Sequence, residues 1–301
     1  MSSQTTTTTT AAATATATQS LSPGATARPR RHSVDLEMVH HNRLFAVLTD
    51  SFVLAKRSLK KIPRQPDWLV GATIQPIMFL LLFRYIFAGS MQYAMPEGVS
   101  AVNYLIAGIV VQGIVFGSIN TAIGLATDAK EGLMDRFRVL PMTRSSVLLG
   151  RIMADTILIV IVTTITVLAG LAVGFRPNGD VLDWLRAIGL MLLFSFALSW
   201  VGAIIGLGLK SIEAVSSIGL IWIFPFTFIS SAFAQPSTFP SWMQGFAKNQ
   251  PFTLVVDSVR GWLTGYPDVG NKGLIATAWL VGLIVVAVPL AVWAYERRAK
   301  S

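Results

Sequence analysis

Few side chains in this sequence have the types and spacing needed for covalent or metal chemistry. The three histidines, His32, His40 and His41, lie close together near the start of the chain, and cysteine is absent. These counts exclude a histidine-built metal site in the long apolar part of the sequence, and they exclude thiol or disulfide chemistry. We therefore expect no metal to be bound by this chain.

Nucleotide and ion chemistry are also poorly represented. The segment GLGLKS at 206–211 lacks the Gly-Lys step and the preceding strand of a phosphate-binding loop, so we interpret it as a helix end with a snorkelling Lys210. The acidic residues Asp155 and Glu213 lie near the ends of apolar runs, and none is central. Proton- or sodium-driven carriers usually need carboxylates within the membrane. If this protein is a pump, we therefore expect its energy to come from a source other than an ion gradient.

The composition predicts that most of this chain lies in a membrane. Of 301 residues, 53% are hydrophobic and 13% are charged, and the mean hydropathy is +0.60, which leaves too little polar surface for a soluble globule. Continuously apolar runs of about 18 to 25 residues favour spanning helices over a barrel. The predicted fold class is an all-α integral membrane protein with six transmembrane helices. They are expected at 69–88, 104–125, 147–173, 185–209, 214–234 and 274–293.

The basic residues that flank these runs predict the orientation. Most of them fall on one side if both the N and C termini are cytoplasmic, as the positive-inside rule requires. Because this bias accounts for most of the net charge of +9, nucleic-acid binding is not needed to explain it. Arg84 remains within the first run. We favour the interpretation that it is an anchor in an aromatic belt over the alternative that it is a functional charge. The localisation expected is the cell membrane.

The sequence before the first run falls into two parts. Residues 1–42 are rich in Thr and Ala and predict a disordered cytoplasmic tail; an organelle transit peptide is the weaker alternative. Residues 43–66 interleave Leu, Val and Phe with Lys and Arg before two prolines, which predicts an amphipathic helix on the inner membrane surface. Residues 67–298 are then the transmembrane domain.

Polar and small residues inside the runs offer two interpretations each. Gln112 and Asn120 lie eight residues apart in the second run, and packing between helices is as well supported as the lining of a pathway. Three pairs of glycines have the spacing that lets helix backbones approach closely, and ordinary packing is the favoured interpretation. The pairs are Gly113 and Gly117, Gly170 and Gly174, and Gly202 and Gly206.

The segment 130–144 interrupts the apolar runs on the predicted cytoplasmic side. Leu133, Phe137 and Leu140 form one face at helical spacing, a charged face lies opposite, and Pro141 ends the pattern. The charged face contains Asp128, Glu131, Asp135 and Arg138. This predicts a short amphipathic helix at the membrane surface, either a passive connector or a docking element for a soluble partner.

The segment 235–271 lies on the opposite side. Prolines divide it into pieces too short to span a membrane, yet it is too apolar for an open loop. We expect two short helices that dip into the outer leaflet, the second beginning at Pro251 with Asn249 as its cap and ending near Gly261. Surface aromatic anchors are the alternative. The candidate residues of this re-entrant segment are Trp242, Phe246, Asn249, Pro251, Arg260 and Trp262.

Three segments in this order carry a resemblance to a known family. EGLMDRFRVLPMTRSSVLLGRIMADT at 131–156, LFRYIFAG at 82–89 and NQPFTLVVDSVRGWLTG at 249–265 resemble the cytoplasmic loop, the end of the first span and the extracytoplasmic segment of ABC-2 type transporter permeases. The nearest subgroup is the daunorubicin-resistance (DrrB-like) membrane subunit. The resemblance covers roughly residues 44–298.

The resemblance implies a permease subunit of an ATP-driven exporter, with ATP and Mg²⁺ bound by a separate ABC ATP-binding subunit and no cofactor bound by this chain. It implies a homodimer, or a heterodimer with a sister permease, surrounded by membrane lipids. The implied cargo is an amphiphilic drug or antibiotic; a lipid or glycolipid is the alternative, and a membrane scaffold or enzyme outside this family is less well supported. The implied coupling-helix residues are Glu131, Gly132, Met134, Asp135, Arg136, Phe137, Arg138 and Pro141.

Overall fold

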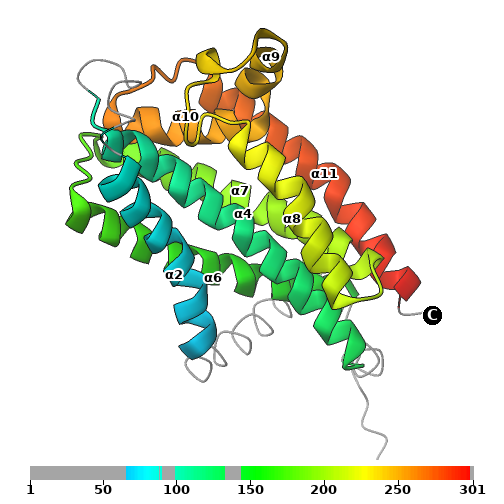
Figure 1. The fold of residues 1–301 in the computed structure, drawn as a ribbon. Helices are drawn as coiled ribbons and strands as arrows, with labels where there is room; N and C mark the ends of the chain where they lie inside the picture. Colours follow the sequence, from blue (N-terminus) through cyan, green and yellow to red (C-terminus); the bar gives the residue numbers. More distant parts are fainter. Residues whose placement is uncertain (1–65, 88, 90–98, 133–143, 299–301) are drawn as a thin grey trace, which may run out of the picture. The chain divides into compact units, whose positions relative to one another are not determined.

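The computed structural model describes residues 66–87, 89, 99–132 and 144–298, all within one compact unit of the chain, residues 41–301. The expected tail at 1–42 and nearly all of the expected interfacial helix at 43–66 lie outside these ranges. Within the described ranges the regular structure is helical (Figure 1). The all-α fold class is therefore confirmed for this part of the chain.

Five of the described helices are long and apolar enough to cross a membrane, counting α2 and η2 together. The elements in order are α2 (Pro66–Leu82), the π-helix η2 (Phe83–Phe87), α4 (Ala101–Lys130), α6 (Arg144–Val173), α7 (Val181–Gly208), α8 (Ile212–Phe228), the 3₁₀-helix η3 (Pro236–Thr238), α9 (Ser241–Asn249), α10 (Pro251–Thr264) and α11 (Lys272–Arg298). The helix α8 is apolar but shorter than the other five. The sixth span therefore stays a prediction.

The expected fifth span at 214–234 is not a single helix. α8 ends at Phe228, shortly after Pro225, and the next residues form turns. The carbonyls at a helix end need partners when they are buried, and the Gln250 side chain provides them by donating to the carbonyls of Phe226 and Ile229. The apolar composition of the run could not reveal this stop because the donor lies more than twenty residues further along the chain.

Polar contacts sort the helix ends into two groups. At one end of the bundle, Arg151 near the start of α6 pairs with Asp128 near the end of α4, and Arg298 at the end of α11 donates to the last carbonyls of α7. At the other end, Asn103 at the start of α4 donates to the connection after α6, and Lys272 at the start of α11 pairs with α10. We call these the Arg151 end and the Arg260 end. The helices α4, α6 and α7 thus alternate in direction along the chain, whereas α7 and α11 run in the same direction.

α4 is the central helix of the described bundle and packs against α2, α6, α7, α8 and α10 (Figure 1). It approaches α7 closely at Gly202 and Gly206, where an added Cβ would overlap the carbonyl oxygens of Ser118 and Ala122. The packing interpretation of this glycine pair is confirmed. The pair at 170 and 174 differs, because Gly174 has a φ of +111° and ends α6 instead of packing against another helix.

Candidate functional site

A cavity of about 730 Å³ lies between α2, α4 and α6. Apolar side chains from all three helices line it, including Phe79, Phe116 and Leu158. Polar side chains line it as well, and those of α4 include Gln112 and Asn120. The volume falls within the range of about 300–1,000 Å³ that is usual for small-molecule sites. A cavity with both kinds of lining can hold a molecule that is itself part apolar and part polar.

The structure brings Gln112 and Asn120, the two polar residues predicted for the second span, into this one cavity. Asn120 is exposed within it, whereas only 4% of Gln112 is exposed. The Gln112 side-chain Nε2 has no hydrogen-bond partner among the described residues. Neither amide is used to join helices through a hydrogen bond in the described part of the chain, so the alternative of a lined pathway gains support over helix packing.

A charged cluster lies in the cavity wall towards the Arg151 end. The Arg151 Nη1 is 2.5 Å from an Asp128 carboxylate oxygen, and its Nε is 3.2 Å from Asp155. The guanidinium rests on α4 at Gly124, where an added Cβ would overlap it. No group of three or more acidic or histidine side chains in the described ranges is arranged to hold a metal ion. The cluster is therefore an electrostatic link between α4 and α6.

The predicted docking segment leaves α4 beside this cluster. α4 continues through Lys130, so Asp128 and Lys130 belong to the spanning helix and not to a separate amphipathic one. Glu131 caps α4, and Gly132 follows with a φ of +69°, a left-handed conformation that favours glycine. The other candidate residues, Met134, Asp135, Arg136, Phe137, Arg138 and Pro141, lie outside the described residues. The docking helix itself stays a prediction.

The two short helices expected near the Arg260 end are present as α9 and α10. The predicted cap is wrong: Asn249 is the last residue of α9 and donates back to the Gly245 carbonyl, while Gln250 occupies the N-cap position before Pro251. α10 also runs past Gly261 to Thr264 and ends at Gly265, which has a φ of +74°. Pro251 fixes the helix start by its backbone geometry, so no side-chain cap is needed.

α10 is enclosed by protein. Nearly all of its side chains are buried, and it packs against α4, α7 and α11. Trp262 contacts α11 closely enough that a Cβ added at Gly273 would overlap its ring. α9 differs, because Trp242 and Phe246 are 79% and 49% exposed. Membrane contact of the predicted re-entrant segment can therefore come mainly from α9, which favours the surface-anchor alternative at Trp242.

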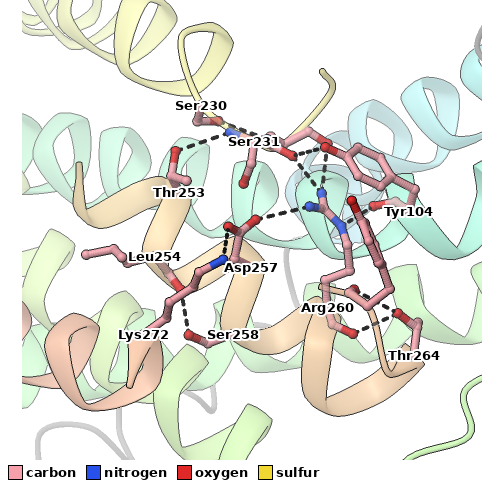
Figure 2. A network of polar contacts seen from close by, with 12 residues as sticks. Tyr104, Ser230, Ser231, Thr253, Leu254, Asp257, Ser258, Arg260, Thr264 and Lys272 are labelled. Atoms are coloured by element: carbon pink, nitrogen blue, oxygen red, sulfur yellow. Dashed lines mark hydrogen bonds and ion pairs between the residues drawn. The ribbon is translucent and has the colours of Figure 1, made fainter. Parts of the chain in front are cut away.

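Arg260 of α10 is the centre of a buried polar network (Figure 2). It is 1% exposed, donates to the carbonyl oxygens of Tyr104 and Ser231 at 2.7 Å, and lies 3.7 Å from the centre of the Tyr104 ring. Asp257 accepts from Arg260 at 3.3 Å and from Lys272 at 3.0 Å. Burial lowers the pKa of Arg260 from its ordinary value, and Tyr104 and Asp257 oppose that shift. The network ties α10 and the turn after α8 to α4.

The positions of Arg260 and Arg84 were only partly foreseen. From the sequence, Arg260 was expected only as a residue of the outer re-entrant segment, with no internal partner assigned, whereas it is fully buried. Asp257 three residues earlier was the one local sign of an internal pair.

Arg84 does lie beside Tyr85, 5.8 Å from its ring centre, but it also donates to the carbonyl of Val173, the last residue of α6. Arg84 therefore stabilises a helix C-terminus.

The long apolar helices are those of a multi-pass membrane protein, and a cavity with mixed lining lies between three of them. Comparison with known proteins makes this specific: residues 49–263 match the ABC-2 type transporter family, and the chain belongs to that family. The predicted resemblance is confirmed. A permease of this kind has a transport role, and ATP hydrolysis lies in a separate subunit.

Three relatives illustrate the breadth of the similarity. The chain is 30% identical over 242 residues to a daunorubicin resistance ABC transporter permease protein, DrrB1, of Streptomyces coeruleorubidus, covering 80% of this chain and 84% of the relative. It is 27% identical over 252 residues to a probable doxorubicin resistance ABC transporter permease of Mycobacterium tuberculosis, covering 83% and 89%. It is 24% identical over 217 residues to a putative transport permease of Porphyra purpurea, covering 72% and 74%.

Proposed function

We propose that the chain is the membrane-spanning subunit of an ATP-driven exporter, that it moves an amphiphilic drug or antibiotic out of the cell, and that the cargo binds between α2, α4 and α6. The observation that carries this proposal is the cavity of about 730 Å³ with apolar and polar lining in one space. The names of two relatives add that those proteins act in drug resistance.

A lipid or glycolipid cargo is the second candidate, and the length of the cavity favours it. The lining extends along α4 from Ile109 to the cap residue Glu131. At about 1.5 Å per residue this is roughly 33 Å, comparable to the thickness of the hydrocarbon core. A site of that length can accept an extended chain as well as a compact aromatic molecule.

The proposed assembly has six spans, cytoplasmic termini, two permease copies or one copy with a sister permease, and ABC ATP-binding subunits docked at the segment 130–144. The Arg151 cluster supports this arrangement, because it joins α4 to α6 where the docking segment leaves α4. Movement of that segment by an ATPase would reach both helices and change the cavity between them. This is a shift between two states driven by a ligand that prefers one of them.

Filling the cavity tests the proposed binding site. Gly71 of α2 lines the cavity, and a Cβ added there meets no atom within 4 Å, so Gly71 can accept a side chain, and Gly71→Leu should reduce the space. Gly282 of α11 is equally open but does not line the cavity, so Gly282→Leu is the matched control. In cells that also express the ATP-binding subunit, Gly71→Leu should raise doxorubicin accumulation and Gly282→Leu should not. Unchanged efflux by Gly71→Leu would remove the cavity from the transport route.

Reversing charge on the docking segment tests the proposed coupling. Glu131→Lys combined with Arg138→Glu keeps the net charge and leaves the apolar face of the segment unchanged. Insertion in the membrane should survive, whereas co-purification with the ATP-binding subunit, or substrate-stimulated ATP turnover, should be lost because charge complementarity is reversed on one side only. Normal complex formation together with normal export would reduce the segment to a connector.

A further inference from the structure

We propose that Gln112 is a specificity-determining residue of the cavity and that its side-chain amide donates a hydrogen bond to an acceptor oxygen in the apolar part of the ligand. The inference rests on the proposed function, because it takes the cavity as the ligand site. It narrows the ligand class from amphiphiles in general to those that carry a carbonyl or similar oxygen within their apolar body.

The Gln112 amide is buried beside empty space and lacks a partner. Its residue is 4% exposed, it lines the cavity, and its Nε2 has no hydrogen-bond partner in the described part of the chain. The large majority of buried polar side-chain atoms in proteins are paired, and each orphan calls for an explanation. An amide beside a cavity large enough for a small molecule is explained by a ligand group that completes the pair.

The geometry of glutamine allows this donation without a change in α4. The terminal side-chain torsion is broad, so a rotation exchanges the positions of Nε2 and the amide oxygen. The hydroxyls of Ser195 and Ser199 on α7 are also buried without a hydrogen-bond partner among the described residues, but they do not line the cavity. A helical serine can turn its hydroxyl towards the carbonyl four residues earlier, so those orphans indicate no ligand.

The distribution of polarity along α4 indicates how the ligand lies. Gln112 has apolar lining neighbours, Ile109 and Phe116, whereas Asn120 and the Arg151 cluster follow towards the other end of the cavity. Eight residues of helix separate Gln112 from Asn120, about 12 Å. The polar head of an amphiphile therefore fits near Asn120 and beyond, and its acceptor oxygen lies about 12 Å deeper. An ester-linked membrane lipid and an oxygenated aromatic compound both have this chemistry.

A single thiol in the cavity can report occupancy. The chain contains no cysteine, so Asn120→Cys gives one thiol at an exposed position of the cavity wall. The rate of its reaction with N-ethylmaleimide is measured on the full chain in nanodiscs with 9-fluorenone or fluorene, which share a tricyclic body and differ by one carbonyl. Fluorenone should protect the thiol at about tenfold lower concentration than fluorene, as expected for one hydrogen bond in a desolvated site.

Matched variants separate the inference from the proposed function. Gln112→Met, which keeps length and removes the donors, should make the two compounds protect equally, and Gly282→Cys should be protected by neither. Slower labelling in diester than in diether nanodiscs, without added compound and dependent on Gln112, would assign the acceptor to a lipid. Equal protection with Gln112 present overturns the inference but leaves the cavity as a binding site. No protection in any arm overturns both.

Discussion

Replacing Arg260 with methionine should strongly destabilise the protein although this side chain does not line the cavity. Arg260 is fully buried and donates to the carbonyls of Tyr104, Ser231 and Ala232 and to Asp257. Methionine matches the length of the apolar part of the side chain and removes every donor. The expected result is a loss of unfolding free energy at the Arg260 end of the bundle.

The magnitude follows from what each partner keeps. Ser231 retains the Tyr104 hydroxyl as a donor, and Asp257 retains Lys272. The Ala232 carbonyl loses the Arg260 guanidinium as its donor, which costs about 1–3 kcal/mol for an unpaired buried carbonyl. The hydrogen bonds of the guanidinium are worth about 1.5–3 kcal/mol each, and they are offset in part because the charge no longer has to be buried. A net loss of about 3–5 kcal/mol is expected.

The assay is equilibrium unfolding of the purified variants in one detergent, with Arg186→Met as the control. Arg186 also pairs with an aspartate three residues away, at 3.2 Å, but half of its side chain is exposed. An exposed pair contributes about 0–1 kcal/mol, so this control should unfold nearly as the parent protein does. Equal stability of the Arg260 and Arg186 variants would refute the reasoning that the buried network holds α10 in place.

Two further predictions concern packing and orientation. Gly108→Ala should impair folding, because its Cβ would overlap the Ala232 carbonyl, whereas Gly189→Ala, with no atom within 4 Å of the added Cβ, should be tolerated. The measurement is the thermal stability of the two purified variants, and equal values would contradict the close packing at Gly108. Cysteines at Ser33 and Ser301 should be shielded from impermeant maleimide in intact cells and one at Ser241 should react; the opposite pattern would reverse the orientation.

The sequence was sufficient for most of the long helices, because continuous apolarity is itself the physical requirement for crossing a bilayer. The expected second and sixth runs are found within α4 and α11, but both helices are longer than predicted. The reason is that hydropathy measures the apolar thickness, whereas a helix continues into charged residues such as Asp128 when they find partners. Helix ends are therefore set by contacts that the apolar pattern does not contain.

The buried networks could not be predicted for the same reason. Arg260 bonds to Tyr104 across 156 residues of chain, and Arg151 bonds to Asp128 across 23. In the sequence, Arg151 is a basic residue near the start of an apolar run on the predicted cytoplasmic side, which the positive-inside rule already accounts for. Arg260 lies in the predicted outer segment 235–271, between two apolar runs. Gln112 and Asn120 could be identified as candidate site residues from the sequence, because a polar residue inside an apolar run is unusual whatever its neighbours are in the fold. Their common cavity required the arrangement of α2 and α6.

The contacts at the two ends of α4 differ in how much free energy is needed to break them, and this difference suggests where the cavity opens. At the Arg260 end, a buried guanidinium bonds to backbone carbonyls, and breaking such contacts costs several kcal/mol. At the Arg151 end, the ion pair to Asp128 joins two side chains that are each 29% exposed, and pairs of this kind are worth much less. We therefore expect α4 and α6 to separate at the Arg151 end while α10 stays fixed. Amide hydrogen exchange in residues 120–130 should then be faster in the ATP-bound complex than in the ATP-free complex, and exchange in α10 should remain slow in both. Faster exchange in α10 on ATP binding would contradict this expectation.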